Sequence, residues 1–214
     1  MIVVMALPLF SLSPASQKEW LRQRLAHPLP LGTTGLSDGF RFPGRERRAT
    51  PAAVLVPIVN RSDGLMVLLT LRSAGLPEHA GQISFPGGRV EAQDASVADA
   101  ALREANEEVG LLAERVTILG ELTAYETVTG YRVTPVVGWV EPPFELTLDP
   151  IEVADVFEAP LAFLVDEQNR RRQFRMFGET RVEFWAIPYG ERYIWGATAA
   201  MILILERTLR GAEL

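Results

Sequence analysis

The sequence predicts an α+β fold in which a mixed β-sheet lies between helices. Short apolar runs typical of strands stand on both sides of one amphipathic segment typical of a helix, and a second helical pattern lies near the C-terminus. Strands and helices do not alternate one by one, as a doubly wound nucleotide-binding fold would require. The order strands, helix, strands, helix therefore favours a mixed sheet with helices packed on its faces.

One domain with an N-terminal extension is expected, because 214 residues suffice for one hydrophobic core and no second globular pattern is visible. We expect residues 1–50 to form the extension, with a short helix and an ordered loop, and residues 51–214 to form the main domain. Ser13 and Pro14 are typical of an N-cap and a first helical position. The proline- and glycine-rich residues 27–50 are typical of a loop or a linker.

The other elements follow from periodicity and turn residues. Asp63 and Gly64 supply the turn of a β-hairpin between two apolar runs. Either Asp94 or Ser96 can cap the central helix, and Gly110 is well placed to end it. We expect strands at residues 52–59, 65–72, 83–88, 116–126, 131–140 and 182–189, and helices at residues 95–109, within 158–166 and at 196–210.

Composition excludes several classes of function. Apolar residues at 48% and charged residues at 22% are ordinary globular values, and the net charge of −6 provides no broad basic surface for a nucleic acid or an anionic membrane. Because of this net charge, an anionic substrate would need a local basic pocket or a bridging cation. The absence of cysteine excludes disulfides, zinc–thiolate sites and thiol nucleophiles, and suits the cytoplasm.

The apolar start, residues 1–10, is not typical of an export signal, because it lacks a basic segment and is interrupted by Pro8. An added edge strand, a disordered lead-in or a start codon assigned too early fits it better. No apolar run approaches the roughly 20 residues that a membrane span needs.

The central helix carries three glutamates in five positions, in the stretch "ALREANEEVG". On a helical wheel Glu108 falls inside the apolar arc and Glu104 near its edge, while Arg103 and Glu107 lie on the far side. One interpretation is an Arg103 ion pair beside solvated glutamates. The other is a cation site, because a carboxylate at the border of the core is costly unless it is paired or bound to a cation.

Oxygen-rich clusters of this kind suit Mg²⁺ or Mn²⁺. Gly87 and Gly88 precede the helix, and two consecutive glycines let a backbone carbonyl approach a ligand closely.

At this point "GGRVEAQDASVADAALREANEEVGL", residues 87–111, resembles the signature of the Nudix hydrolases, with a complete R-E-x-x-E-E-x-G core from Arg103 to Gly110. The first acidic position departs from the family pattern, because Asp94 replaces the usual glutamate and lies one residue further from the core. Both a catalytic role and a helix-capping role are open for Asp94. The resemblance implies a Nudix-type α/β/α sandwich.

A second segment, "LLTLRSAGLPEHAGQISFPGG" (68–88), resembles the additional signature of the coenzyme A pyrophosphatase branch of that family. Pro77 stands where this branch commonly has an arginine. His79 belongs to the signature, and for it we expect a structural role rather than metal binding.

The resemblance implies a metal-dependent hydrolase that splits coenzyme A into 3′,5′-ADP and 4′-phosphopantetheine. It implies that Mg²⁺ or Mn²⁺ is held by Glu104, Glu107, Glu108 and the carbonyl of Gly87, with Arg103 orienting a glutamate. Catalytic roles are thus expected for Glu104, Arg103 and Glu108.

The base that activates water is open between Glu104 and two acids, Glu152 and Glu158, of "DPIEVADVFEAP", a segment that we expect to be a loop. Arg72 and Arg89 are candidates for binding substrate phosphates. The basic run at residues 169–175 fits a solvated loop or hairpin better than a phosphate site.

The expected partner is a small molecule of the coenzyme A class, with no nucleic acid or membrane, and a homodimer is possible. The alternatives are a Nudix hydrolase of ADP-ribose or dinucleotides and a non-catalytic module that binds a nucleotide.

Overall fold

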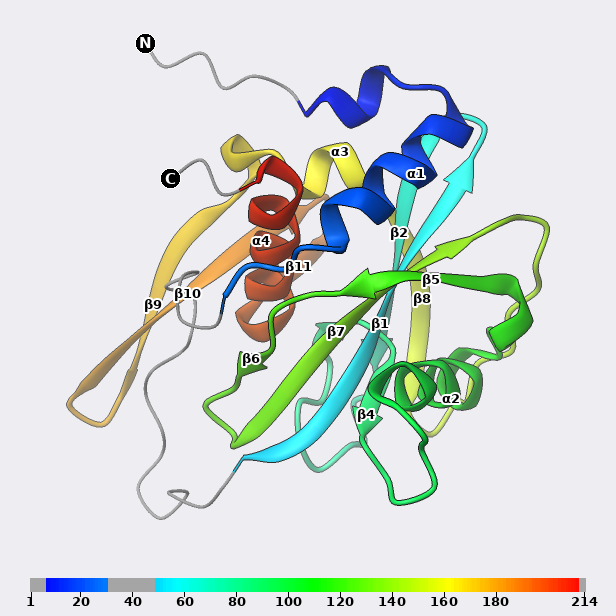
Figure 1. Ribbon diagram of the computed structural model, residues 1–214. Helices are drawn as coiled ribbons and strands as arrows, with labels where there is room; N and C mark the ends of the chain where they lie inside the picture. Colours follow the sequence, from blue (N-terminus) through cyan, green and yellow to red (C-terminus); the bar gives the residue numbers. More distant parts are fainter. Residues whose placement is uncertain (1–6, 31–48, 212–214) are drawn as a thin grey trace, which may run out of the picture.

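The computed structural model describes residues 7–30 and 49–211, and within them a large mixed sheet forms the centre of the molecule (Figure 1). Its strands run in the order β3-β2-β1-β7-β5, with β4 also paired to β1, β6 to β7 and β8 to β2. Their bounds are β1 Thr50–Arg61, β2 Gly64–Arg72, β3 Ile83–Ser84, β4 Gly87–Arg89, β5 Val116–Glu121, β6 Tyr125–Glu126, β7 Tyr131–Val140 and β8 Val153–Pro160. The sheet is mixed because β1 and β7 run parallel, whereas the other pairs are antiparallel.

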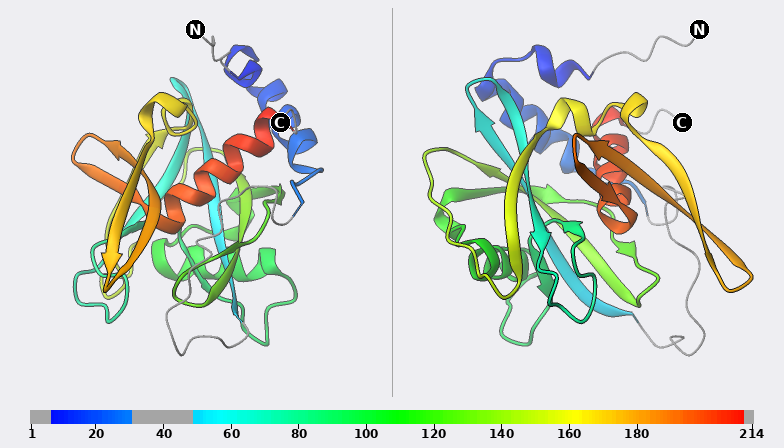
Figure 2. Two further views of the ribbon diagram at one scale, coloured as in Figure 1. Left: turned by 90° about the vertical axis from the view of Figure 1, so that its left-hand side faces the viewer. Right: turned by 180° about the vertical axis from the view of Figure 1, so that it is seen from behind.

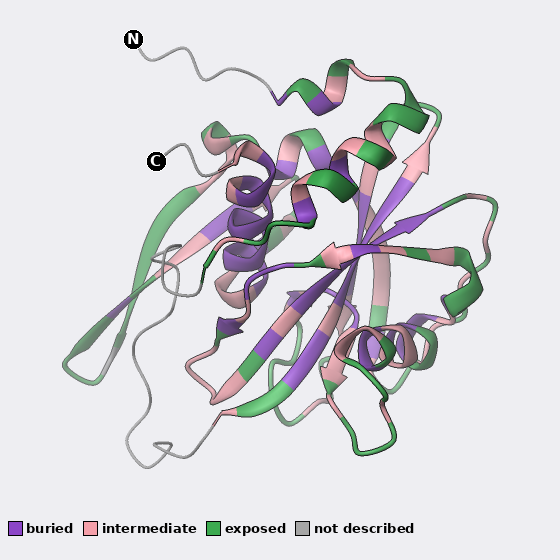
Figure 3. Cartoon of the chain, in the orientation of Figure 1, coloured by how far each residue is buried: buried purple, intermediate pink, exposed green. Residues whose placement is uncertain are grey.

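Helices cover both faces of this sheet, as predicted. The α-helices are α1 Pro14–Leu25, α2 Val97–Val109, α3 Leu161–Leu164 and α4 Gly196–Arg210, and short 3₁₀ turns are η1 Pro8–Ser11, η2 Ala113–Arg115 and η3 Glu167–Asn169. One hydrophobic core lies between the sheet and α2, and a second lies between the sheet and α1 with α4 (Figure 3). The α/β/α sandwich is therefore confirmed.

Strand β1 shows why the apolar run at its centre is nearly continuous. Ala53, Leu55 and Val59 belong to the core beneath α2, whereas Val56 and Ile58 belong to the core beneath α1 and α4. Alternate side chains of a strand point to opposite faces, so a strand covered on both faces needs apolar residues at almost every position.

Helix α2 begins and ends at the residues that local chemistry favours. The Ser96 hydroxyl accepts a hydrogen bond from the Asp99 N–H (3.1 Å) and donates one to the Asp99 carboxylate (2.8 Å), so Ser96 is the N-cap. Gly110 ends the helix in the left-handed region, with φ 70°. The capping role considered for Asp94 is therefore wrong, because Ser96 fills that position.

A second sheet, in the order β11-β10-β9, is formed by β9 Arg171–Phe177, β10 Thr180–Tyr189 and β11 Arg192–Trp195. The β9–β10 hairpin projects beyond the central sheet, both in Figure 1 and in the view from behind in Figure 2. Residues 171–175 of the basic run thus form a strand of this hairpin. The sequence favoured a solvated loop or hairpin over a phosphate site for this run.

Two strands were not predicted. Strand β8 was read as a loop with acidic residues, and β11 was not recognised. The strand expected at residues 83–88 is divided into β3 and β4, and the one expected at residues 116–126 into β5 and β6. The other predicted elements are present, and the helix expected within residues 158–166 is the single turn of α3.

The Ser13 cap and Pro14 start α1 as predicted, and Leu21 and Leu25 of that helix are buried in the core shared with α4. Most of the loop expected over residues 27–50 lies outside the described residues, as do residues 1–6. The domain boundary at residue 50 therefore stays a prediction. In the part of the chain that the structure describes, no helix is long and apolar enough to cross a membrane.

Candidate active site

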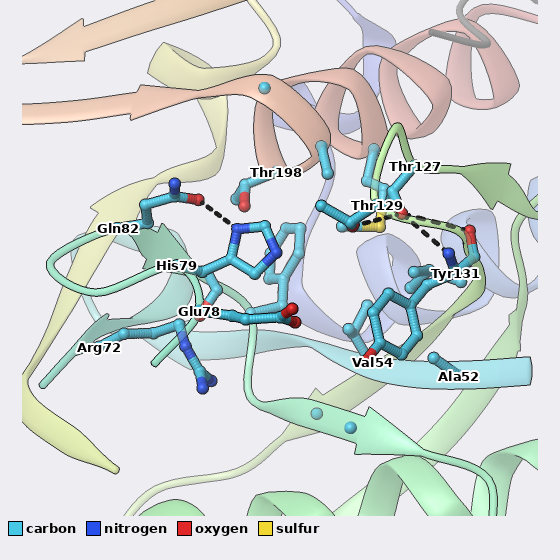
Figure 4. A pocket seen from close by; sticks show the side chains of 18 of the residues that line it. Ala52, Val54, Arg72, Glu78, His79, Gln82, Thr127, Thr129, Tyr131 and Thr198 are labelled. Carbon is cyan, nitrogen blue, oxygen red and sulfur yellow. Dashed lines mark hydrogen bonds between the residues drawn. The ribbon is translucent and has the colours of Figure 1, made fainter. Parts of the chain in front are cut away.

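A cavity of about 670 Å³ opens between the two sheets, and it contains most of the residues that the sequence singled out (Figure 4). Its floor is formed by β1, by β4 and by Glu104 of α2. The loop between β2 and β3 forms one wall, and β10, β11 and the start of α4 form the wall opposite the glutamates.

Glu108 is buried at the border of the core, as the helical wheel predicted, with only 4% of the residue exposed. Its carboxylate lies 3.5 Å from the guanidinium of Arg72 and accepts a hydrogen bond from the Gly87 N–H (3.2 Å). Burial raises the pKa of Glu108 to about 7, although Arg72 and the Gly87 N–H act in the opposite direction. A charged Glu108 is thus unfavourable unless more positive charge is supplied.

Gly87 presents its backbone to the same carboxylate. The neighbouring pair, Leu55 and Pro86, is hydrogen-bonded across the antiparallel ladder (2.9 Å), so Gly87 opposite Val54 is a non-hydrogen-bonded position. Both its N–H and its C=O therefore point away from β1, to the side on which Glu108 lies. A side chain at this position would meet backbone atoms of β1 at 2.4 to 2.6 Å, so the close approach requires glycine.

Glu104 lies directly against Gly88. A Cβ atom on Gly88 would stand 2.5 Å from Oε1 of Glu104, so only glycine leaves room for this carboxylate. Burial raises the pKa of Glu104, while the adjacent Arg103 lowers it. Glu104 and Glu108 therefore both carry carboxylates whose charge the protein only partly compensates.

Arg103 is the centre of an ion-pair cluster on the outer side of α2. Its guanidinium lies 3.0 Å from both Glu104 and Glu107, and it donates two hydrogen bonds to Asp94, at 2.9 and 3.1 Å. It also donates to the Arg89 carbonyl (3.0 Å). These bonds lower the pKa of Asp94, with Arg103 as the main cause. Asp94 therefore holds Arg103 in place instead of capping the helix.

Glu107 differs from the other two glutamates, because 57% of its side chain is exposed and its carboxylate faces Arg103. The structure thus agrees in part with each of the two interpretations of the glutamate cluster. Arg103 forms the ion pairs of the solvated interpretation, whereas Glu104 and Glu108 lie in the partly buried positions that a cation site requires.

The two arginines expected to bind phosphates, Arg72 and Arg89, line the cavity at different places. Nε of Arg72 is buried and has no hydrogen-bond partner among the described residues, which is unfavourable for a donor of this kind. Arg89 instead donates to the Tyr131 hydroxyl (2.9 Å) and lies over its ring. Arg72 therefore has unused hydrogen-bonding capacity beside Glu108, and Arg89 is held by Tyr131 at another part of the wall.

The structure separates the two acids that the sequence could not distinguish. Glu152 lines the cavity, and its negative charge is close enough to raise the pKa of both Glu104 and Glu108. Glu158 is paired with Arg61, through hydrogen bonds of 2.6 and 3.0 Å, and is not among the residues that line the cavity.

The donor set fits a divalent cation of the Mg²⁺ type. Among the described residues no three Asp, Glu or His side chains converge as ready-made ligands. Mg²⁺ does not require such a group, because it usually keeps several waters and takes one or two carboxylates. Glu104, Glu108 and the Gly87 carbonyl supply hard oxygen ligands, and a cation would compensate the two carboxylates that burial disfavours.

Sequence reasoning missed the far wall of the cavity, which is formed by residues of β10, β11 and α4. Val182, Phe184 and Trp195 are its main apolar members. The alternation in "VEFWAIPY" indicated which residues share a face of β10, but no local signal indicated which segment that face would meet.

Several known proteins are similar to this chain in sequence. A family model described as NUDIX domain matches residues 49–177. Proteins named "Uncharacterized Nudix hydrolase NudL" from Citrobacter koseri and from Escherichia coli O1:K1 / APEC are each 46% identical to this chain over 154 residues, or 71% of this chain and 78% of the relative. A solved MutT/nudix family protein from Enterococcus faecalis is 17% identical and covers 91% of this chain and 73% of its own, with a TM-score of 0.47.

Proposed function

Because the chain belongs to the Nudix family, we propose that it is a divalent-metal-dependent diphosphatase that hydrolyses coenzyme A, or a derivative of it, to 3′,5′-ADP and 4′-phosphopantetheine. The observation that carries the coenzyme A assignment is the position of residues 68–88. Nine residues of this segment line the cavity: Arg72, Glu78, His79, Gln82, Ile83, Ser84, Phe85, Gly87 and Gly88. The segment that resembles the coenzyme A signature is therefore in a position to contact the substrate.

The residues that would hold Mg²⁺ or Mn²⁺ are Glu104, Glu107, Glu108 and the Gly87 carbonyl. When bound, such a cation neutralises phosphate oxygens, orients the attacking water and lowers its pKa. Arg103 keeps Glu104 in position through a charge-assisted hydrogen bond.

A phosphate-binding role is proposed for Arg72, which lies beside Glu108. Its buried Nε lacks a partner, and a guanidinium fork matches the oxygens of a phosphate. Arg89 is the weaker of the two candidates, because Tyr131 already accepts one of its hydrogen bonds.

The proton of the attacking water goes to Glu152 or to Glu104. The side-chain carboxylate of Glu152 has no hydrogen-bond or ion-pair partner among the described residues, whereas that of Glu104 is paired with Arg103. Replacing Glu152 with glutamine should lower kcat by roughly 10² to 10⁴ if Glu152 is the base. Glu158→Gln is the matched control, because Glu158 is paired with Arg61, and an unchanged kcat in Glu152→Gln would assign the base to Glu104.

Product analysis tests the proposed function directly. Purified protein incubated with coenzyme A and Mg²⁺ should yield 3′,5′-ADP and 4′-phosphopantetheine, separated by chromatography and identified by mass. The same preparation should show a lower kcat/KM with ADP-ribose. A kcat/KM for ADP-ribose equal to or above that for coenzyme A would overturn the assignment of the substrate and favour the ADP-ribose alternative.

A further inference from the structure

His79 has a backbone conformation that is uncommon for residues other than glycine. Its φ is +58°, and it is the one non-glycine residue with a positive φ in the part of the chain that the structure describes. Glycine adopts this region most readily, and asparagine, aspartate and histidine are the other residue types enriched in it. Residues in such conformations occur preferentially at functional sites, so an observed outlier is a reason to ask what the side chain does.

The loop that carries His79 is closed tightly at its base. The Arg72 N–H donates to the Gln82 carbonyl (2.9 Å), and the Gly81 N–H donates to the Arg72 carbonyl (3.1 Å). At the opposite wall, the Thr198 hydroxyl of α4 donates to the Ile83 carbonyl (2.9 Å) and ties the helix to the strand that follows the loop. These bonds hold the backbone of residues 73–82 whatever side chain stands at position 79.

The imidazole of His79 is oriented by Gln82. Nδ1 of His79 lies 3.0 Å from Oε1 of Gln82, which can only accept a hydrogen bond, so Nδ1 carries a proton. In the neutral ring Nε2 is then an acceptor. Figure 4 shows the ring above Glu78, with Nε2 turned away from Gln82 and into the cavity.

The contact with Gln82 alone does not account for a histidine at this position. The ring is exposed, and one exposed hydrogen bond between neighbours in a loop contributes little to stability. Asparagine or glycine would also satisfy the backbone. What only histidine provides is an acceptor nitrogen of fixed orientation at the wall of the cavity.

We propose that His79 is a substrate-positioning residue: its Nε2 accepts a hydrogen bond from a hydroxyl or N–H group on the part of the substrate that extends beyond the diphosphate. The proposal rests on the proposed function, since it takes a diphosphate linked to two larger groups as the substrate. Both halves of coenzyme A carry suitable donors. Gln82 supports His79 by holding its tautomer and the direction of its ring.

The test compares wild type with His79→Asn, because asparagine keeps the positive φ and removes the imidazole. We expect KM for coenzyme A to rise roughly tenfold, the loss of about one hydrogen bond, with kcat changed less than twofold. Gln82→Leu should raise KM by about threefold, and the double variant should not exceed His79→Asn, because both changes remove the same contact. The matched control is His27→Asn, the other histidine of the chain, which lies away from the cavity and should leave KM and kcat unchanged.

Product inhibition identifies the half of the substrate that is bound. The inhibition constant of either 3′,5′-ADP or 4′-phosphopantetheine should rise in His79→Asn, while the other stays constant. An unchanged KM would overturn the proposal, and so would a parallel rise of both inhibition constants or a fall in kcat at constant KM. If wild type fails to cleave coenzyme A but cleaves ADP-ribose, the proposed function is wrong, and the KM of the two proteins for ADP-ribose then decides the role of His79.

Discussion

The replacement of Glu108 with glutamine separates a metal-binding role from a structural one. Glutamine keeps the size of the side chain and removes its charge. If Glu108 holds a cation, the variant loses a charged ligand and kcat with Mg²⁺ should fall by roughly 10² to 10⁴, the range for removing one key catalytic group. A role in packing alone predicts nearly normal turnover.

The metal-free protein should respond in the opposite direction. Because the folded-state pKa of Glu108 is raised from 4.5 to about 7, its carboxylate costs nothing below pH 4.5, becomes destabilising as the pH rises, and has its full effect above pH 7. A difference of this size corresponds to about 3 kcal/mol of unfolding free energy at pH 8. Glutamine avoids that cost, but its NH₂ group must lie near Arg72, which removes about 1 kcal/mol of the gain.

The assay is thermal melting of wild type and Glu108→Gln in EDTA, together with kcat in Mg²⁺. At pH 8 the variant should be more stable by about 2 kcal/mol, or about 4 to 8 °C in Tm for a chain of this size. At pH 5 the difference should nearly vanish, because the destabilisation of wild type has by then fallen to about 1 kcal/mol, which the unfavourable contact of glutamine with Arg72 offsets. Glu114→Gln, at an exposed position, is the matched control for loss of one charge and should change neither stability nor kcat.

Two results would refute the reasoning. Wild-type turnover in Glu108→Gln would mean that Glu108 is not a metal ligand. A metal-free variant that melts below wild type at pH 8, or does not fold, would mean that the Glu108 carboxylate stabilises the fold.

Three further changes test the metal requirement, the position of Glu104 and the cap of α2. EDTA in excess should abolish turnover and added Mg²⁺ should restore it, so full activity in metal-free buffer would contradict the metal mechanism. Gly88→Ala should lower kcat at least tenfold while the protein stays folded. The new Cβ would displace only the end of the Glu104 side chain and would meet no backbone atom among its nearest neighbours. Circular dichroism and kcat, measured on the same preparation, check both parts of this expectation. Ser96→Ala should lower the unfolding free energy by about 1 kcal/mol in urea titrations without changing KM, and an unchanged midpoint would show that its cap contributes nothing.

Several features were predictable from the sequence because they depend on neighbouring residues. Helix α2 follows from its periodicity, the Ser96 cap and the Gly110 terminus, all within fifteen positions. The same periodicity predicted that Glu108 would be buried while Glu107 would not, because rotation of about 100° per residue determines the face of each side chain.

Strand β8 was not predictable in this way. It forms because β2 leaves an edge to which residues 153–160 pair, from Met66 opposite Pro160 to Arg72 opposite Val153. Its own residues, with acids at positions 155 and 158, indicate a loop as well as a strand. The pairing depends on a partner about 90 positions away, and tertiary contacts override such weak local preferences.

By itself the sequence determined the helix with its glutamates, the glycines beside it and the mixed sheet, since each is encoded by residue type and spacing over short distances. Only the tertiary structure decided which charges meet. It brought Arg72 of β2 to Glu108 of α2, separated Glu152 in the cavity from Glu158 on Arg61, and gave His79 its orientation. The physical reason is that such contacts join segments whose separation in space is determined by the packing of the whole chain, and no local pattern records that distance.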